Sequence, residues 1–169
     1  MIDIEKLTAL AIAYDAGDAR RVQHLIKVYA YSRLIGRSEG LDEHTQNILE
    51  AAAILHDIGI HEAERKHGSS GGHWQELEGP AVAAPMLVQC GATGSESERV
   101  GWLIAHHHTY AAGEDTDFCI LLEADFLVNA YEDGMTAEQC RTAEARVFRT
   151  ETGKKYLGEM FLKPPYRAE

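Results

Sequence analysis

Apolar residues recur along this chain at the three- and four-residue spacing that is typical of amphipathic helices. The first two helical stretches are marked by Ile4, Leu7, Leu10, Ala11 and Tyr14, and by Val22, Leu25, Ile26, Tyr29, Ala30 and Leu34. No segment shows a convincing strand-like alternation. The spacing predicts helices over residues 3–15, 19–36, 43–58, 80–90, 96–108, 118–132 and 137–149, with a weaker helix near 151–161. The predicted fold class is therefore all-α, a single-domain helical bundle.

Helix start and stop signals support this division of the chain. Asp18 and Asp42 are the expected N-caps of two helices. Capping boxes are expected at residues 95–98, Ser-Glu-Ser-Glu, and at residues 136–139, Thr-Ala-Glu-Gln. Because glycine adopts the left-handed conformation that often ends a helix, the expected stops are Gly36, Gly59, Gly91 and Gly134.

The segment from Arg65 to His73 is rich in glycine and serine. It follows His56-Asp57 closely, so it is read either as a flexible connection or as a lid over a nearby site. Beyond it, Pro80 fits a first helical turn, whereas Pro85 would kink a helix interior. The pattern therefore does not fix where the next helix begins.

The length and composition favour one compact domain, because 169 residues, 45% of them hydrophobic, are enough for a substantial core. Acidic residues stand near the amino terminus, where a secretory leader would be basic. No apolar run reaches the roughly 18 residues that would span a bilayer. These features predict a cytoplasmic protein without a membrane partner.

The cysteines and the charge exclude several other classes. Cys90, Cys119 and Cys140 are widely spaced, so they are expected to be reduced core residues rather than a disulfide framework or a structural zinc site. The net charge of -11 would repel a nucleic acid polymer. A small phosphorylated substrate remains compatible, because a metal ion dominates the field near it. The sequence does not decide between a monomer and a homodimer.

Polar residues interrupt two apolar runs in a way that predicts a bound cation. His56 and Asp57 end the run 48–55, and the stripe of that helix directs the His56 imidazole inward. Asp125 lies within the run 120–128, where an unpaired carboxylate would cost several kcal/mol to bury. Glu123 of the same run is expected to face solvent. A cation close to His56, Asp57 and Asp125 would offset these costs.

Three histidines, residues 106–108, follow a further apolar stretch at a predicted helix end. Consecutive residues cannot share one helical face, and His107 is the one that stacks over Val100, Leu103 and Ile104. His107 is therefore the favoured inward ligand, with His106 as the alternative.

With His24 on the second predicted helix, the order His24, His56-Asp57, Asp125 resembles the HD superfamily of metal-dependent phosphohydrolases. The resemblance implies a helical bundle of the HD-domain type with a metal-binding core at about 20–130 and a C-terminal helical extension at about 136–169. It also implies that His24, His56, Asp57 and Asp125 bind one divalent metal ion.

Histidines between the HD pair and the last aspartate are similar to a variant of the superfamily that binds two metal ions. The nearest matches for the second ion are His73 and His107, with His106 and Glu78 as alternatives. The chain departs from that variant at Gln75, where a histidine usually precedes the glycine of the Gly79-Pro80 pair. This leaves His73, Glu76 and Glu78 as substitutes.

The ligand types indicate the chemistry. Imidazoles with carboxylates suit Mn, Fe, Co, Ni or Zn, and a carboxylate-rich set admits Mg. Such an ion polarises a phosphoryl oxygen and activates a water molecule, so Asp57 and His107 are the expected catalytic residues. Arg21 and Lys66 are the expected substrate-binding residues, and Arg20 and Lys27 could also neutralise phosphate oxygens.

The resemblance therefore implies a phosphohydrolase that acts on a small phosphate ester such as a nucleotide. Two alternatives stay open. The same scaffold with two irons would give a di-iron oxygenase, and a metal-bound module could sense a nucleotide without turnover.

Overall fold

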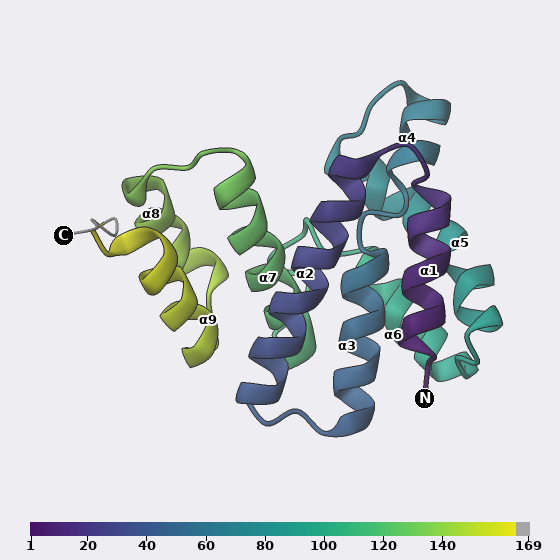
Figure 1. Ribbon diagram of the computed structural model, residues 1–169, viewed down its shortest axis with the longest axis horizontal. Helices are drawn as coiled ribbons and strands as arrows, with labels where there is room; N and C mark the ends of the chain where they lie inside the picture. Colours follow the sequence, from purple (N-terminus) through teal and green to yellow (C-terminus); the bar gives the residue numbers. More distant parts are fainter. Residues whose placement is uncertain (165–169) are drawn as a thin grey trace.

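The computed structural model describes residues 1–164, and over this range the chain is all-α, as the sequence predicts (Figure 1). The helices are α1 (Ile4–Tyr14), α2 (Ala19–Ser38), α3 (Glu43–Leu55), α4 (Ile60–His67), α5 (Gly72–Gln89), α6 (Gly94–Ile104), α7 (Thr116–Glu132), α8 (Ala137–Val147), α9 (Glu151–Leu157) and the π-helical turn η1 (Gly158–Leu162). In the described range, no helix is both long and apolar enough to cross a membrane.

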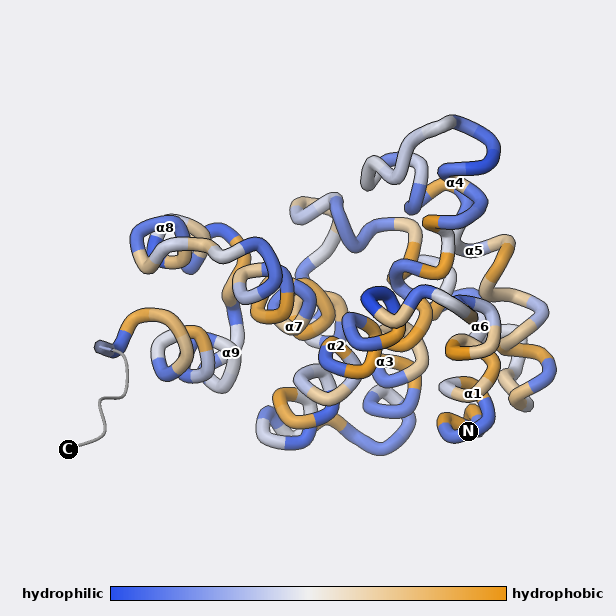
Figure 2. Tube along the Cα trace, turned by 45° about the horizontal axis from the view of Figure 1, so that its top comes forward, coloured by the Kyte–Doolittle hydropathy of each residue, from blue (hydrophilic) through white to orange (hydrophobic). Residues whose placement is uncertain are grey.

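Helix α2 is central, because it packs against α3 on one side and α7 on the other. Helices α1 and α6 pack against α3, and α4 and α6 pack against α5. Helices α8 and α9 lie together beyond α7, at the left of Figure 1. Hydrophobic positions gather where α2, α3 and α7 face one another (Figure 2), and one buried cluster runs from Ile2 to Leu157.

The helix starts follow the capping signals in most places. The side chain of Asp18 accepts a hydrogen bond from the Arg21 amide, and Asp42 caps α3 in the same way. The capping box that begins with Thr136 is confirmed. The other box is displaced: Thr93, paired with Glu96, caps α6 in place of Ser95, so α6 starts earlier than predicted.

The predicted helix over 43–58 is wrong at its end. Helix α3 stops at Leu55, and a new helix, α4, starts at Ile60 and extends to His67, into the segment 65–73 that the sequence left as a connection or lid. Gly59 forms the corner between them. A Cβ atom there would lie 2.7 Å from both the carbonyl oxygen of Gln75 and the amide nitrogen of Gly79. The corner is therefore pressed directly onto the backbone of α5.

Helix α5 begins at Gly72 rather than near residue 80 and contains both Pro80 and Pro85. Helix α2 continues through Gly36 to Ser38, so Gly36 is no stop. Gly91 and Gly134 have the left-handed φ values of 79° and 64° expected after a helix end.

Glu123 is fully buried, contrary to the expectation that it faces solvent. Its carboxylate accepts hydrogen bonds from the backbone amides of Arg149 and Thr150 and from the Thr150 hydroxyl. Glu123 thus ties α7 to the start of α9, because a buried carboxylate needs such donors.

Candidate metal centre

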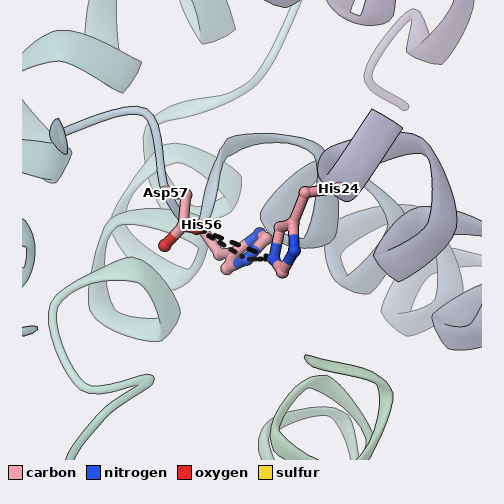
Figure 3. A group of neighbouring side chains, drawn as sticks. All are labelled: His24, His56 and Asp57. Carbon is pink, nitrogen blue, oxygen red and sulfur yellow. Dashed lines mark hydrogen bonds and ion pairs between the residues drawn. The ribbon is translucent and has the colours of Figure 1, made fainter. Parts of the chain in front are cut away.

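Helices α2, α3 and α7 bring four polar side chains to one point inside the bundle. His24 comes from the middle of α2, His56 caps the C-terminal end of α3, Asp57 follows it, and Asp125 comes from α7. The Nε2 atom of His24 lies 3.2 Å from Nε2 of His56 and 3.2 Å from Oδ1 of Asp125. Figure 3 shows the rings of His24 and His56 directed toward each other, with Asp57 beside them.

The outer ring nitrogens define the tautomers of three histidines. Nδ1 of His24 lies 3.0 Å from Glu132 Oε2, Nδ1 of His56 lies 2.8 Å from the carbonyl oxygen of Ala53, and Nδ1 of His107 lies 2.7 Å from that of Ile104. Carbonyl and carboxylate oxygens only accept, so each Nδ1 donates. In each neutral ring the lone pair is therefore on Nε2, which is the orientation that metal-binding histidines commonly have.

Asp57 connects two groups of such ligands. Its Oδ2 atom lies 3.6 Å from Nε2 of both His24 and His56, whereas its Oδ1 atom lies 3.3 Å from Nε2 of His107. In the described range, candidate ligand atoms lie within 4.8 Å of one another in the trio His24, His56 and Asp57, and again in the trio Asp57, His107 and His108. One carboxylate thus belongs to both trios.

Without a metal ion, the buried carboxylates of the cluster depend on protonated histidine for positive charge. Nε2 of His107 is buried and has no hydrogen-bond partner among the described residues. Burial lowers the pKa of His24, but the carboxylates of Asp125 and Asp57 outweigh burial and raise that pKa to about 9. Burial also favours the neutral carboxyl groups, yet the histidines hold the pKa values of Asp57 and Asp125 well below their usual range. Inward lone pairs and ionised carboxylates are a donor set that fits a divalent metal ion.

His108 is a member of the second trio that the sequence did not single out. Because α6 ends at Ile104, the histidines lie in a turn rather than on a helix, and the rule that neighbours cannot share a face no longer applies. Residues in the first turns of α5 contact His108 and fix its position. Gln75 Oε1 lies 3.0 Å from its Nε2, Glu76 accepts its backbone N–H, and a Cβ on Gly72 would lie 2.6 Å from its ring. Partial burial and the nearby His107 lower the pKa of His108 to about 4.

The other expected ligands for a second ion lie elsewhere. His73 is exposed and its ring lies against Trp74. Glu78 is bound by Lys66 and by His67, with 2.8 Å between Glu78 Oε1 and His67 Nε2. Both residues are on α5, and neither belongs to a ligand trio.

His106, the alternative to His107, stacks on Trp102 with ring centroids 4.5 Å apart. Its Nδ1 atom lies 2.7 Å from the Trp102 carbonyl oxygen. His106 belongs to neither ligand trio.

A pocket of about 320 Å³ opens onto His24 and Asp57. Arg20 and Arg21 both line it. The Arg21 guanidinium is already held, because it lies 2.7 Å from Glu64 Oε1 and 3.1 Å from His61 Nδ1. Arg20 has no ion-pair partner in the described range. Two of the expected phosphate-binding residues are engaged elsewhere: Lys66 pairs with Glu78 outside the pocket, and Lys27 pairs with Glu132.

The fold and the cluster together define an all-α protein with a histidine-aspartate centre suited to a divalent metal ion. The family model described as HD domain matches residues 21–149, and the chain therefore belongs to the HD domain family. The match extends beyond the expected core at 20–130 and includes α8. Comparisons with curated proteins and with solved structures gave no match.

Proposed function

We propose that this protein is a metal-dependent phosphohydrolase that cleaves a small phosphate ester. Membership of the HD domain family supports this, because the family typically consists of metal-dependent phosphohydrolases. The observation that carries the proposal is the convergence of three imidazole Nε2 atoms on two carboxylates, with each Nδ1 held from outside.

The residues of the chain have distinct tasks in this proposal. His24, His56, Asp57 and Asp125 hold one divalent ion, and the trio of Asp57, His107 and His108 is the candidate for a second. A divalent ion in this cluster supplies Lewis acidity and activates water for attack on a phosphate ester. Asp57 has an oxygen directed toward each trio, so it can orient the attacking water or accept its proton.

The pocket beside His24 and Asp57 suits a small substrate, with Arg20 at its wall to pair with a phosphate oxygen. A cytoplasmic location and the lack of nucleic acid and membrane partners are part of the same proposal, on the basis of composition and charge. Mn, Fe, Co, Ni, Zn and Mg all fit the donor set, so metal identity needs direct measurement.

Elemental analysis of the purified protein, combined with phosphate release from a panel of nucleotides and sugar phosphates in added Mn, Co or Mg, tests this function. We expect chelation to abolish phosphate release and divalent metal to restore it. Full activity in protein shown to be metal-free would overturn the mechanism. Asp133, an exposed carboxylate at the end of α7, provides a control for variants of the ligand carboxylates: Asp133→Ala should have the metal content and activity of the wild type.

A second candidate function is a di-iron oxygenase, because Asp57 belongs to both ligand trios and such an enzyme would need two metal ions. Redox-active iron with oxygen uptake and no phosphate release would support it. A nucleotide that binds tightly and stays intact after long incubation would instead support a metal-bound sensor.

A further inference from the structure

The pocket beside the metal centre has a lining that bears on the substrate. It is bordered by the start of α2, the corner between α3 and α4, the start of α5 and the end of α7. Apart from the imidazole of His24, no aromatic ring is found among its lining residues in the described range. The apolar part of the lining is aliphatic, from residues such as Ile54 and Ile58.

The two tryptophans of the chain, Trp74 on α5 and Trp102 on α6, are stacked on neighbouring side chains. Trp74 stacks on His67 with centroids 3.8 Å apart. Trp102 stacks on His106, and the guanidinium of Arg99 lies 4.7 Å from the Trp102 ring centroid. Stacking on a free aromatic face is a main source of affinity for a nucleobase. Neither tryptophan lines the pocket, and within the described residues the lining offers a base no aromatic face besides the His24 imidazole, so this site is poorly suited to a base.

Tyr110 is an exposed ring that does not line this pocket. It lines a different cavity with Cys119 and Arg146, between the loop after α6 and the end of α8. A base stacked there would not occupy the pocket that contains Arg20 and Arg21.

The polar part of the lining consists largely of hydrogen-bond acceptors that are held in place. Asn129 donates its amide to Asp125 at 2.9 Å, which leaves its carbonyl oxygen as an acceptor. Asp15 is held by His61 at 3.0 Å, and Asp18 by its cap on α2. The hydroxyl of Ser70 adds a group that can both donate and accept. Such a fixed set of acceptors matches the hydroxyl groups of a polyol.

Charge limits the number of phosphates. Asp15, Asp18 and Glu132 line the pocket together with Asp57, against Arg20 and Arg21. A phosphate held by the metal centre and Arg20 is compatible with this lining, whereas a second phosphate further out would face carboxylates.

We propose that the substrate is the phosphate monoester of a small sugar or polyol, recognised by acceptors between α1 and α2 and on α7, and by Ser70. The inference rests on the proposed phosphohydrolase function and narrows its substrate class, in preference to a nucleotide.

Two matched pairs of substrates test this with the metal-loaded full chain. Adenosine 5′-monophosphate has adenine in place of the anomeric hydroxyl of ribose 5-phosphate, and glycerol phosphate and propyl phosphate differ only in their hydroxyls. We expect kcat/KM to be at least tenfold higher for ribose 5-phosphate than for the nucleotide, and at least tenfold higher for glycerol phosphate than for propyl phosphate. Equal or reversed preferences in either pair would overturn the inference while leaving a phosphohydrolase.

Ser70→Ala adds a test at the residue level. The loss of one hydroxyl should raise KM for glycerol phosphate about threefold to tenfold, with kcat retained and a smaller effect on propyl phosphate. Ser38→Ala, at the exposed end of α2, is the matched control. An equal rise in KM for both esters in Ser70→Ala would contradict the proposed role of Ser70. Phosphate release from no ester at all would overturn the proposed function together with the inference.

Discussion

The tautomer and orientation of His24, His56 and His107 are set by the group that each Nδ1 atom contacts. The carbonyl oxygens of Ala53 and Ile104 belong to the last turns of α3 and α6, so the helix ends themselves orient His56 and His107. Glu132 does the same for His24 from the last turn of α7. Helix termini thus orient His56 and His107, because carbonyl groups there lack intrahelical partners.

Asp125→Ala should lose most of the bound metal while it keeps the helical fold. The apolar neighbours on α7, rather than the carboxylate, supply the packing of this helix. Elemental analysis and circular dichroism measure the two effects. Metal content equal to that of the wild type would show that Asp125 is not a ligand.

Metal affinity should depend on pH over a window set by His24. Its pKa is raised from 6.5 to about 9, so protonated His24 stabilises the metal-free fold below pH 6.5, and this contribution is lost as pH rises through 9. A metal ion must displace that proton. We therefore expect metal Kd to increase as pH falls below 9, by up to about tenfold per pH unit for one displaced proton.

Calorimetric titration at several pH values, with correction for buffer protonation, measures this dependence. His24→Gln should weaken binding and flatten the dependence between pH 6.5 and 9. A metal Kd of the wild type that stays constant across this window would contradict the assigned role of His24.

The variant His107→Ala should distinguish a centre with one metal ion from a centre with two. If the trio of Asp57, His107 and His108 holds a second ion, the variant binds one metal fewer per chain and loses activity. The ratio of metal to protein, measured by elemental analysis, shows which of the two centres is present. A wild-type ratio near one that is unchanged in the variant would exclude the second site.

At the scale of elements, the corner between α3 and α4 places Asp57 against α5. Gly59→Ala should destabilise the protein by about 1–3 kcal/mol, because the new methyl group would meet backbone atoms of Gln75 and Gly79 that cannot move aside cheaply. Thermal or urea unfolding measures the change.

Gly94→Ala is the control for this prediction. Gly94 starts α6, has no positive φ, and a Cβ there would contact nothing within 4 Å. The same substitution should therefore be neutral or stabilising at this position. Equal unfolding midpoints for the two variants would show that the close approach at Gly59 is tolerated.

Prediction from sequence succeeded best for long helices such as α2 and α7, in which apolar residues at helical spacing recur over several turns. Helix α4 was missed because it is short and mostly polar, with only Ile60 and Ala63 buried, so its hydrophobic spacing is weak. The start of α5 was missed because Pro80 resembled a first turn, although the helix accommodates it in its interior.

At the scale of the whole molecule, metal binding should raise the thermal stability. An ion that binds only the folded state contributes RT ln(1 + [L]/Kd), about 2.7 kcal/mol at a hundredfold excess over Kd. For a chain of this size that corresponds to a rise in Tm of roughly 5–10 °C. Differential scanning calorimetry with and without chelator measures it. Identical Tm values would mean that no ion binds selectively to the fold.

The sequence by itself was sufficient for the all-α class and for His24, His56, Asp57 and Asp125 as a set. The fold class follows from the helical spacing of apolar residues, and His56 and Asp125 stand out as polar residues placed where that spacing requires burial. His24 joined the set through the resemblance to the HD superfamily. The tertiary structure decided which remaining residues join them. His108 lies beside Asp57 and His73 does not, because α6 ends at Ile104 and α5 begins at Gly72. Contacts of this kind depend on where helices end and how they cross, and neither is encoded in the spacing within one helix.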